Sequence, residues 1–215
     1  MPSVAIVCES PPDNANLLTT IEQRLELIGG LGLDRCIVVG DGGLWPPAVA
    51  ASAVVEVPPV ALSDAQAPVS SSSIRDALTG GHVEVAAAML GRPYEVVGVV
   101  EHGDHRGRTI GFPTANLALP QRLQLPADGV YGGWYQARAG ELHLAAINLG
   151  RRPTFYAEGT RLLEAYLLDF DGDLYGDDAR VRFGMRLRDE LKFDSVDELV
   201  EQMHADVDAV RRAQS

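Results

Sequence analysis

The sequence contains only two cysteines, Cys8 and Cys36, and no C-x-x-C pair in its 215 residues. This scarcity argues against cysteine-based zinc and dithiol redox motifs, and it fits a reducing compartment. The chain also lacks a G-x-S-x-G segment, which argues against hydrolases built on a nucleophile elbow. It shows neither a basic N-terminal region followed by an apolar core nor an apolar run of about 20 residues. We therefore expect a cytoplasmic protein with no signal peptide and no contact with a membrane.

Positive charge is also scarce. The 18 Lys and Arg residues face 30 Asp and Glu residues, which gives a formal net charge of −12. A nucleic-acid backbone requires a basic surface, so this balance argues against nucleic acid as a partner. A small anionic ligand remains compatible, because a local cluster of arginines can override the overall sign. The chain length suits one large globular domain or two small ones.

The first part of the chain has the pattern of an α/β fold. Apolar runs at Val4–Val7 and Cys36–Val39 predict strands. The spacing of apolar residues over Leu17–Ile28 predicts a helix between them, with Thr19 or Thr20 near its start and Gly29-Gly30 as its stop. A strand, a helix and a strand in this order indicate a βαβ unit with a parallel pair. Further elements are expected as a strand at Val54–Val57 and as helices at Ile74–Leu78 and Val83–Leu90.

After Tyr94 the pattern changes to short runs that alternate or are rich in β-branched and aromatic residues. Several strands at close spacing predict an antiparallel β-barrel. The segment Ser195–Arg212 predicts a C-terminal helix, with Ser195 as its N-cap and Glu198 three residues later as the second member of a capping box. The strands are expected at Val96–Val100, Val130–Ala137, Leu142–Asn148, Leu162–Phe170 and Ala179–Phe183.

A ten-residue stretch that begins at Gly107, G-R-T-I-G-F-P-T-A-N, carries the strongest chemical signal. Its two glycines let the backbone approach a ligand closely, and its proline excludes a helix interior. Thr114 and Asn116 offer oxygen ligands of the kind that Mg²⁺ accepts, and Arg108 adds positive charge. These features indicate a site for a magnesium-bound polyphosphate, although no Walker loop is present. A tight turn whose glycines only allow the bend is the open alternative.

The same stretch resembles the signature of the bacterial and eukaryotic riboflavin kinases, which in bacteria usually form the C-terminal half of a bifunctional FAD synthetase. The resemblance implies a kinase β-barrel over residues 91–215, with ATP as phosphate donor, riboflavin as acceptor and FMN and ADP as products. It runs from about Val69 to about Val210 through V-S-S-S-S-I-R, L-G-R-P-Y, N-L-G-R-R-P-T-F, L-E-A-Y-L-L-D-F-D-G-D-L-Y-G and R-L-R-D-E-L-K-F.

The resemblance assigns the catalytic base to Glu164. Strand alternation alone leaves two orientations open for Glu164: into the barrel, where an unpaired carboxylate is costly, or outward to water. Thr114 and Asn116 are carried over as ligands of Mg²⁺ and phosphate, with turn capping as the alternative role. For the two arginines of R-L-R-D-E-L-K-F the alternative is a solvated charged segment. The other residues that the resemblance places near nucleotide or flavin are Gly107, Arg108, Gly111, Pro113, Asn148, Arg186 and Arg188.

Residues 1–90 depart from the family. The adenylyltransferase half of the bifunctional enzymes depends on an early G-x-F-D-G-x-H-x-G-H segment, and this chain has no histidine before Val69. We interpret residues 1–90 as a truncated nucleotidyltransferase-like α/β region that lacks FAD synthetase activity and offers a surface for homodimerisation. Two functions stay open: an ATP-dependent riboflavin kinase, and a non-catalytic regulatory protein that binds flavin or FMN.

Overall fold

The computed structural model describes residues 4–8, 16–33, 35–39, 69–102, 111–138, 140–151 and 161–213. The chain divides into two compact units, one formed by Met1–Ser71 with Gln121–Gln124 and the other by Ser72–Pro120 with Leu125–Ser215. The strand predicted at Val54–Val57 lies outside the described residues. The division of function between residues 1–90 and 91–215 stays a prediction.

The first unit contains a two-stranded parallel sheet and one helix. β1 (Val4–Cys8) pairs in parallel with β2 (Arg35–Val39), and α1 (Ile21–Gly29) lies between them in the sequence. The predicted strand, helix and strand are therefore confirmed, together with the parallel pairing. Whether this unit is a nucleotidyltransferase remnant stays a prediction, because the same short pattern occurs in many α/β folds.

α1 begins at Ile21 rather than at Leu17 because a capping box fixes its start. The Thr20 hydroxyl accepts the Gln23 N–H at 3.3 Å, and the Gln23 side chain accepts the Thr20 N–H at 2.8 Å. Leu17 instead forms a parallel bridge with Leu123 of the same unit. The N-cap is thus Thr20, one of the two threonines expected near the helix start, and the apolar residues Leu17 and Leu18 precede the helix.

Apolar side chains are exposed on the described part of this unit. Exposed apolar surface of this kind is typical of interaction sites. Homodimerisation through this region stays a prediction. The exposed residues are Leu25, Leu27, Leu31, Leu33 and Val38.

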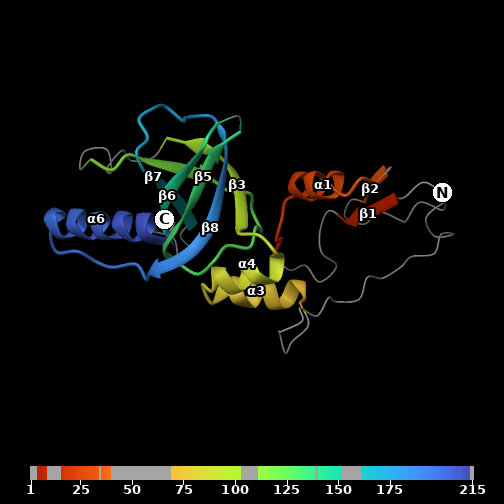
Figure 1. Cartoon of the computed structure of the whole chain (residues 1–215), viewed down its shortest axis with the longest axis horizontal. Coiled ribbons are helices and arrows are strands. Elements are labelled where there is room, and N and C mark those ends of the chain that lie inside the picture. Colours follow the sequence, from red (N-terminus) through yellow and green to blue (C-terminus); the bar gives the residue numbers. More distant parts are fainter. Residues whose placement is uncertain are drawn as a thin grey trace. The chain divides into compact units, whose positions relative to one another are not determined.

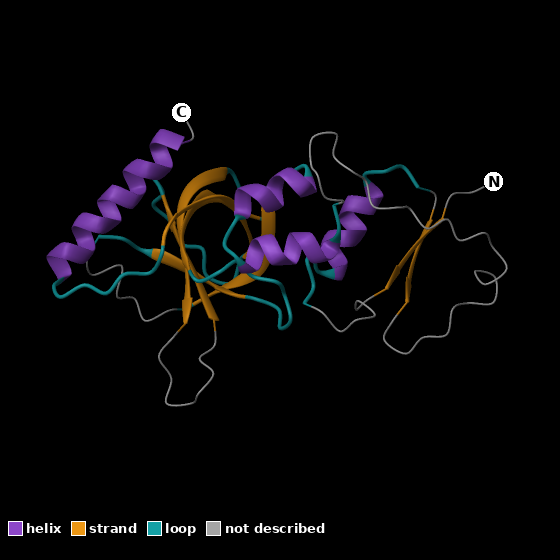
Figure 2. Cartoon of the chain, turned by 90° about the horizontal axis from the view of Figure 1, so that it is seen from below, coloured by secondary structure: helices purple, strands orange, loops and turns teal. Residues whose placement is uncertain are grey.

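The second unit is built on a closed antiparallel barrel with the strand order β3-β4-β7-β6-β5-β8, seen as a ring of strands in Figure 2. The predicted barrel is confirmed. The strand that the sequence analysis missed is β4, because the glycine-rich motif that leads into it indicated a turn. The strands are β3 (Tyr94–Glu101), β4 (Thr114–Ala118), β5 (Gly129–Ala137), β6 (Leu142–Arg151), β7 (Arg161–Leu167) and β8 (Asp178–Arg188).

Alternate residues of each strand fill the barrel interior. In β7, Leu163 and Ala165 are fully buried, whereas Glu164 and Tyr166 lie on the other face and are half-buried. Aromatic rings occupy much of the interior, and the Tyr131 and Phe183 rings meet edge to face with centroids 5.3 Å apart. The interior is therefore a packed core rather than a ligand channel.

α4 (Val83–Leu90) and α6 (Val196–Ala213) pack against the barrel of this unit, and α3 (Ser71–Thr79) precedes α4 in the sequence. α3 and α4 form a pair, and α4 packs against β3 and β8. α6 packs against β5 and β6, and Figure 1 shows its C-terminal end beside the barrel. The predicted C-terminal helix is thus confirmed, and the Ser195 hydroxyl accepts the Glu198 N–H at 3.2 Å.

A second apolar core lies between α6 and the outer face of the barrel. Phe112, Leu168, Val207 and Val210 form its buried centre. Because α6 covers this face, residues of β6 and β7 that point away from the barrel interior do not simply face water. This arrangement decides where the predicted site residues lie.

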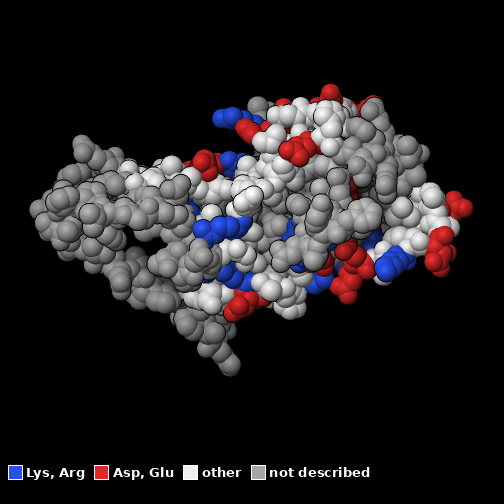
Figure 3. All heavy atoms as spheres, turned by 180° about the vertical axis from the view of Figure 1, so that it is seen from behind, with Lys and Arg blue, Asp and Glu red and all other residues white. Residues whose placement is uncertain are grey.

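The described surface carries both signs of charge, and Figure 3 shows basic and acidic side chains interspersed on one face. Glu95 illustrates the pattern: it is 8% exposed and pairs with Arg180 at 3.0 Å and with Arg182 at 2.8 Å. Within the described ranges, no helix is both long enough and apolar enough to cross a membrane.

Candidate active site

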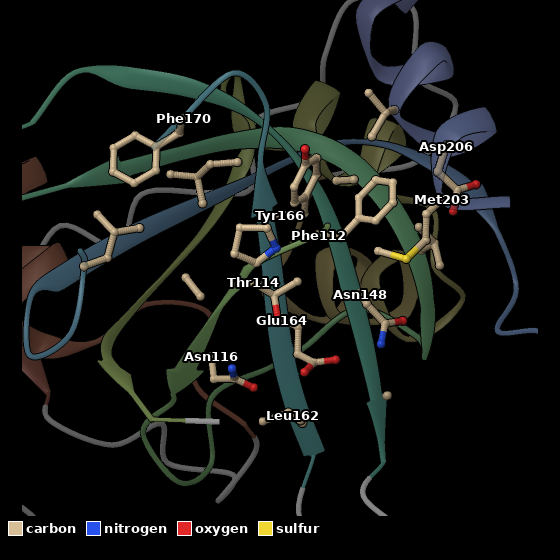
Figure 4. Close-up of a pocket in the computed structure, with 18 of the residues that line it drawn as sticks. Phe112, Thr114, Asn116, Asn148, Leu162, Glu164, Tyr166, Phe170, Met203 and Asp206 are labelled. Atoms are coloured by element: carbon tan, nitrogen blue, oxygen red, sulfur yellow. The ribbon is translucent and has the colours of Figure 1, made fainter. Parts of the chain in front are cut away.

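A cavity of about 780 Å³ lies on the outer face of the barrel beneath α6. Its walls are the outward-facing residues of β4, β6 and β7, the cavity side of α6, and the segments that follow β7 and β8. This volume is in the range of pockets that bind small molecules and cofactors. Figure 4 shows polar side chains toward one end of the cavity and aromatic side chains toward the other.

Three polar side chains from three neighbouring strands form a row on the floor of this cavity. Asn116 of β4 lies directly opposite Glu164 of β7, and Glu164 lies directly opposite Asn148 of β6. Opposed residues of an antiparallel pair share one face of the sheet and have neighbouring Cβ atoms. All three line the cavity, and Figure 4 shows their polar ends gathered there. The fold therefore brings together three residues from three separate motifs.

Glu164 occupies neither of the environments that strand alternation left open. Leu163 and Ala165 take the barrel interior, so the Glu164 side chain points outward. The outward face at this position is the half-buried cavity rather than bulk water. No residue in the described ranges hydrogen-bonds to its carboxylate. The carboxylate is therefore held in place by the strand and is available to a ligand.

Asn116 is the most buried polar residue of the row. It is 8% exposed, and its Oδ1 atom has no hydrogen-bond partner among the described residues. A buried oxygen without a donor costs about 1–3 kcal/mol, so this atom fits a ligand that brings positive charge. Thr114 lies two residues earlier on the same face of β4 and also lines the cavity. The hydroxyl and amide oxygens of these residues are hard ligands that suit Mg²⁺.

Clustered side chains of the usual metal-binding types are absent from the described part of the chain. No three or more His, Cys, Asp or Glu side chains are grouped so that they could hold a metal ion there. The predicted donors Thr114 and Asn116 are of a different chemical type, and their role as metal ligands stays a prediction.

The C-terminal residues of the glycine-rich motif line the cavity. Gly107 and Arg108 lie outside the described residues. Gly111 has φ +88°, a left-handed angle that favours glycine, and a Cβ at this position meets nothing within 4 Å. The backbone angle rather than crowding therefore requires glycine. Pro113 lines the cavity beside Thr114.

The other end of the cavity is aromatic and apolar. The Phe112 and Tyr166 rings are tilted against each other with centroids 5.0 Å apart, and Phe170 and Met203 complete this end, as Figure 4 shows. Aromatic rings and a thioether form favourable contacts with flat aromatic ligands. The sequence analysis missed these four residues, because single apolar residues beside a motif cannot be told from core residues.

The two predicted arginines of β8 separate at a β-bulge. Val130 of β5 lies opposite Arg188, but the next residue, Tyr131, lies opposite Arg186. Val130 lines the cavity and Tyr131 fills the barrel interior. Arg188 accordingly lines the cavity and binds Asp206 of α6, with Nη2 and Oδ2 2.7 Å apart.

Arg186 has a different set of contacts. Its guanidinium donates to the backbone oxygens of Gly80 at 3.3 Å and Asp128 at 3.0 Å, and to the Asp189 carboxylate at 2.6 Å. Its Cζ atom lies 5.8 Å from the centre of the Tyr131 ring. Arg186 therefore links the α3–α4 turn to the barrel and is not among the residues that line the cavity, and its role in cofactor binding stays a prediction.

Glu190 is a cavity residue that the sequence analysis did not single out. It follows β8, and its carboxylate lies against Gly150 of β6. Burial raises the pKa of the Glu190 carboxyl, the carboxylates of Asp128 and Glu164 raise it further, and two nearby arginines oppose the shift. The motif R-L-R-D-E-L-K-F contains this residue, but a carboxylate in a charged run is usually solvated.

Comparisons with known proteins agree with the barrel fold. Residues 90–214 match the model of the family described as "Flavokinase: Riboflavin kinase". The chain is 42% identical over 147 residues to the bifunctional riboflavin kinase/FMN adenylyltransferase of Bacillus subtilis strain 168, covering 67% of this chain and 46% of that protein. It is 40% identical over 143 residues to the Haemophilus influenzae protein of the same name, covering 66% and 46%.

A solved structure matches nearly the whole chain. It is the crystal structure of a protein named macrolide-efflux protein, from Streptococcus pneumoniae, and it superposes with a TM-score of 0.81 at 28% identity, over 98% of this chain and 84% of that one. This chain spans about half the length of the curated relatives it matches. The family model covers more than half of the chain, including the six barrel strands and the cavity. The chain therefore belongs to the riboflavin kinase family.

Proposed function

We propose that this protein transfers the γ-phosphoryl group of ATP to the 5′-hydroxyl of riboflavin, forming FMN and ADP. The observation that carries the proposal is the row of Asn116, Glu164 and Asn148 on the floor of a cavity, in a chain of this family. Phosphoryl transfer requires an oriented hydroxyl, a base that takes its proton and neutralisation of phosphate charge. The row and its surroundings provide candidates for each of these needs.

Glu164 is the proposed base. Its carboxylate accepts the proton of the 5′-hydroxyl while the hydroxyl oxygen forms a bond to the γ-phosphorus. The bond between the γ-phosphorus and the β,γ-bridging oxygen breaks, and ADP leaves with the electron pair. Asn148 lies beside Glu164 on β6 and can donate through its amide to the same hydroxyl oxygen. The strand pairing fixes both side chains, so orientation requires no large rearrangement.

Thr114 and Asn116 are the proposed metal ligands. The buried, unpartnered Oδ1 of Asn116 fits a hard cation. Mg²⁺, when bound, supplies neutralisation of the phosphate charge. The glycine-rich segment that precedes Thr114 is proposed to contact the phosphates through its backbone N–H groups.

The aromatic end of the cavity is proposed to hold the isoalloxazine ring. Phe112, Tyr166 and Phe170 offer ring faces and edges, and Met203 of α6 adds a polarizable sulfur. α6 covers this side and thereby reduces the access of water to the reacting groups.

We further propose that the chain makes no FAD. The motif by which the adenylyltransferase half holds ATP is missing, since no histidine precedes Val69. The alternative of a non-catalytic flavin-binding protein predicts binding without consumption of ATP.

The test is an incubation of the purified protein with riboflavin, ATP and Mg²⁺, followed by chromatographic separation of the flavins. The comparison includes Glu164→Gln, and Glu141→Gln serves as a matched control because Glu141 is exposed and does not line the cavity. The proposal expects FMN alone from the wild type and the control, and bound but unphosphorylated riboflavin with Glu164→Gln. FMN together with FAD contradicts the proposed loss of adenylyl transfer. Flavin binding without product from the wild type supports the regulatory alternative instead.

A further inference from the structure

The floor of the cavity differs in charge between its two sides. The β4 side presents the hydroxyl of Thr114 and the amide of Asn116, both neutral groups. Beyond Glu164, the β6 side presents Asn148 and then Glu190, a second carboxylate. Arg151 of β6 and Arg188 also line the cavity, so this side carries both signs of charge. The position of Glu190 therefore bears on which polar groups of a substrate lie on the β6 side.

The Glu190 carboxylate can lie in the cavity because Gly150, which it contacts, has no side chain. Gly150 lies on β6 two residues after Asn148, is buried and lines the cavity. A Cβ at Gly150 overlaps with Oε1 of Glu190 and lies only 2.8 Å from its Cδ. The Glu190 carboxylate thus occupies the space that any larger residue at position 150 takes. No described residue forms a hydrogen bond or an ion pair with this carboxylate.

Two carboxylates on the same side of the cavity have a direct electrostatic consequence. Glu164 and Glu190 interact with each other, and this like-charge interaction is one reason why the pKa of Glu190 is raised. Arg161 and Arg188 lower the same pKa, and Arg188 also lines the cavity, so both signs of charge surround the Glu190 carboxylate. Hydroxyl groups donate hydrogen bonds to carboxylates, and such charge-assisted bonds are the stronger kind.

We propose that Glu190 is a specificity-determining residue that accepts hydrogen bonds from the ribityl hydroxyls of the flavin. This inference rests on the proposed function, because it concerns how the acceptor of that reaction is oriented. The carboxylate fixes the polyol chain so that its terminal hydroxyl lies in front of Glu164. A flavin without the polyol gains nothing from Glu190.

The experiment compares two flavins with the same ring. Riboflavin carries the ribityl chain, whereas lumiflavin carries a methyl group in its place, and the binding of both is followed by quenching of isoalloxazine fluorescence. Glu190→Ala is expected to weaken riboflavin binding about tenfold or more, the loss typical of hydrogen bonds to a charged group. It is expected to leave lumiflavin binding and the KM for ATP unchanged. Glu190→Gln, which keeps one acceptor oxygen, is expected to fall in between.

Gly150→Ala supplies an independent way to displace the carboxylate. The added methyl group meets the flexible end of the Glu190 side chain, so the barrel accepts it and the carboxylate moves. The variant is expected to reduce riboflavin binding as Glu190→Ala does. In the Glu190→Ala background, Gly150→Ala is expected to have no further effect, because the double-mutant cycle isolates their interaction.

The outcomes separate this inference from the function on which it rests. If the wild type forms no FMN, the proposed function fails and the inference fails with it. If the wild type forms FMN but Glu190→Ala weakens riboflavin and lumiflavin equally, the residue has only a structural role and the inference alone is overturned. Unchanged riboflavin binding, or a raised KM for ATP, overturns it as well. Selective loss of riboflavin binding in both single variants, without additivity in the double variant, supports it.

Discussion

Arg188 and Asp206 form a bidentate ion pair that joins the end of β8 to α6. Nε of Arg188 lies 3.0 Å from Oδ1 of Asp206, and Nη2 lies 2.7 Å from Oδ2. The Asp206 side chain is only 8% exposed, and Gln202 donates a further hydrogen bond to its Oδ1 at 2.9 Å. Both charged residues line the cavity. The pair therefore fixes α6 over the site at the place where the flavin is proposed to bind.

Asp206→Asn is expected to destabilise the protein by roughly 2–3 kcal/mol, because it leaves Arg188 largely buried without its counter-ion. Asp169→Asn is the matched control, since Asp169 also binds α6 through Arg211 but both side chains are at least half exposed. Its cost is expected to stay below about 1 kcal/mol. Urea unfolding of the three proteins measures the difference, and equal costs for the two variants contradict the assignment of Asp206 as the stronger anchor.

Tyr131 and Tyr135 provide a matched pair inside the barrel. Both rings are fully buried on β5, but the Tyr131 hydroxyl donates to the Ala127 oxygen at 2.6 Å, whereas no described residue hydrogen-bonds to the Tyr135 hydroxyl. Burial raises the pKa of Tyr135 to about 12, and the nearby Asp177 carboxylate contributes to this rise. Tyr131→Phe is expected to cost about 1 kcal/mol, and Tyr135→Phe to be neutral or stabilising. Thermal unfolding of the two variants distinguishes them.

Asn116→Leu tests the proposed role of Asn116 as a metal ligand by two measurements, the stability of the metal-free protein and the rate of FMN formation. Replacing a buried, unpartnered amide oxygen by an apolar group of similar size is expected to leave the metal-free protein equally stable or more stable. The same change is expected to lower FMN formation about tenfold or more, because even supporting residues of metal sites cost 10–100-fold when they are changed. A large loss of stability in metal-free buffer instead assigns Asn116 a structural role.

Glu190→Gln is expected to change how stability depends on pH. Since the pKa of Glu190 is higher in the folded protein than its ordinary value of 4.5, the folded state binds this proton more tightly than the unfolded state does. The contribution of the Glu190 carboxyl to the free energy of unfolding is therefore fully present below its pKa in the unfolded state. This contribution is lost as the pH rises through the pKa of the carboxyl in the folded state. The Gln variant lacks this loss, so it is expected to gain stability relative to the wild type from acidic pH to neutrality. A constant difference across that range contradicts the raised pKa.

The sequence predicted the barrel, its C-terminal helix and the residues of the polar row, because long motifs mark these strands. It did not predict how Glu164 is oriented, since alternation along β7 cannot show that α6 covers the outer face of the barrel. Arg186 and Arg188 are two positions apart and are expected on one face of a regular strand. The β-bulge opposite Val130 and Tyr131 separates them, and nothing in the local pattern marks this bulge.

Glu190 and the aromatic end of the cavity escaped prediction for a related reason. Glu190 stands in a run of charged residues that is typical of a solvated segment, and only its contact with Gly150 reveals that it faces the cavity. Phe112 and Tyr166 have the character of core residues. Their role as cavity walls depends on the placement of α6, which sequence periodicity does not supply.

The row of Asn116, Glu164 and Asn148 exists only once three strands from distant parts of the chain have come together. No partly folded form in which β4 has yet to meet β7 can contain it. Contacts of this kind form late and slowly in β-rich proteins. A ligand that binds at the row therefore binds only the closed barrel, and by mass action it shifts the folding equilibrium toward that state.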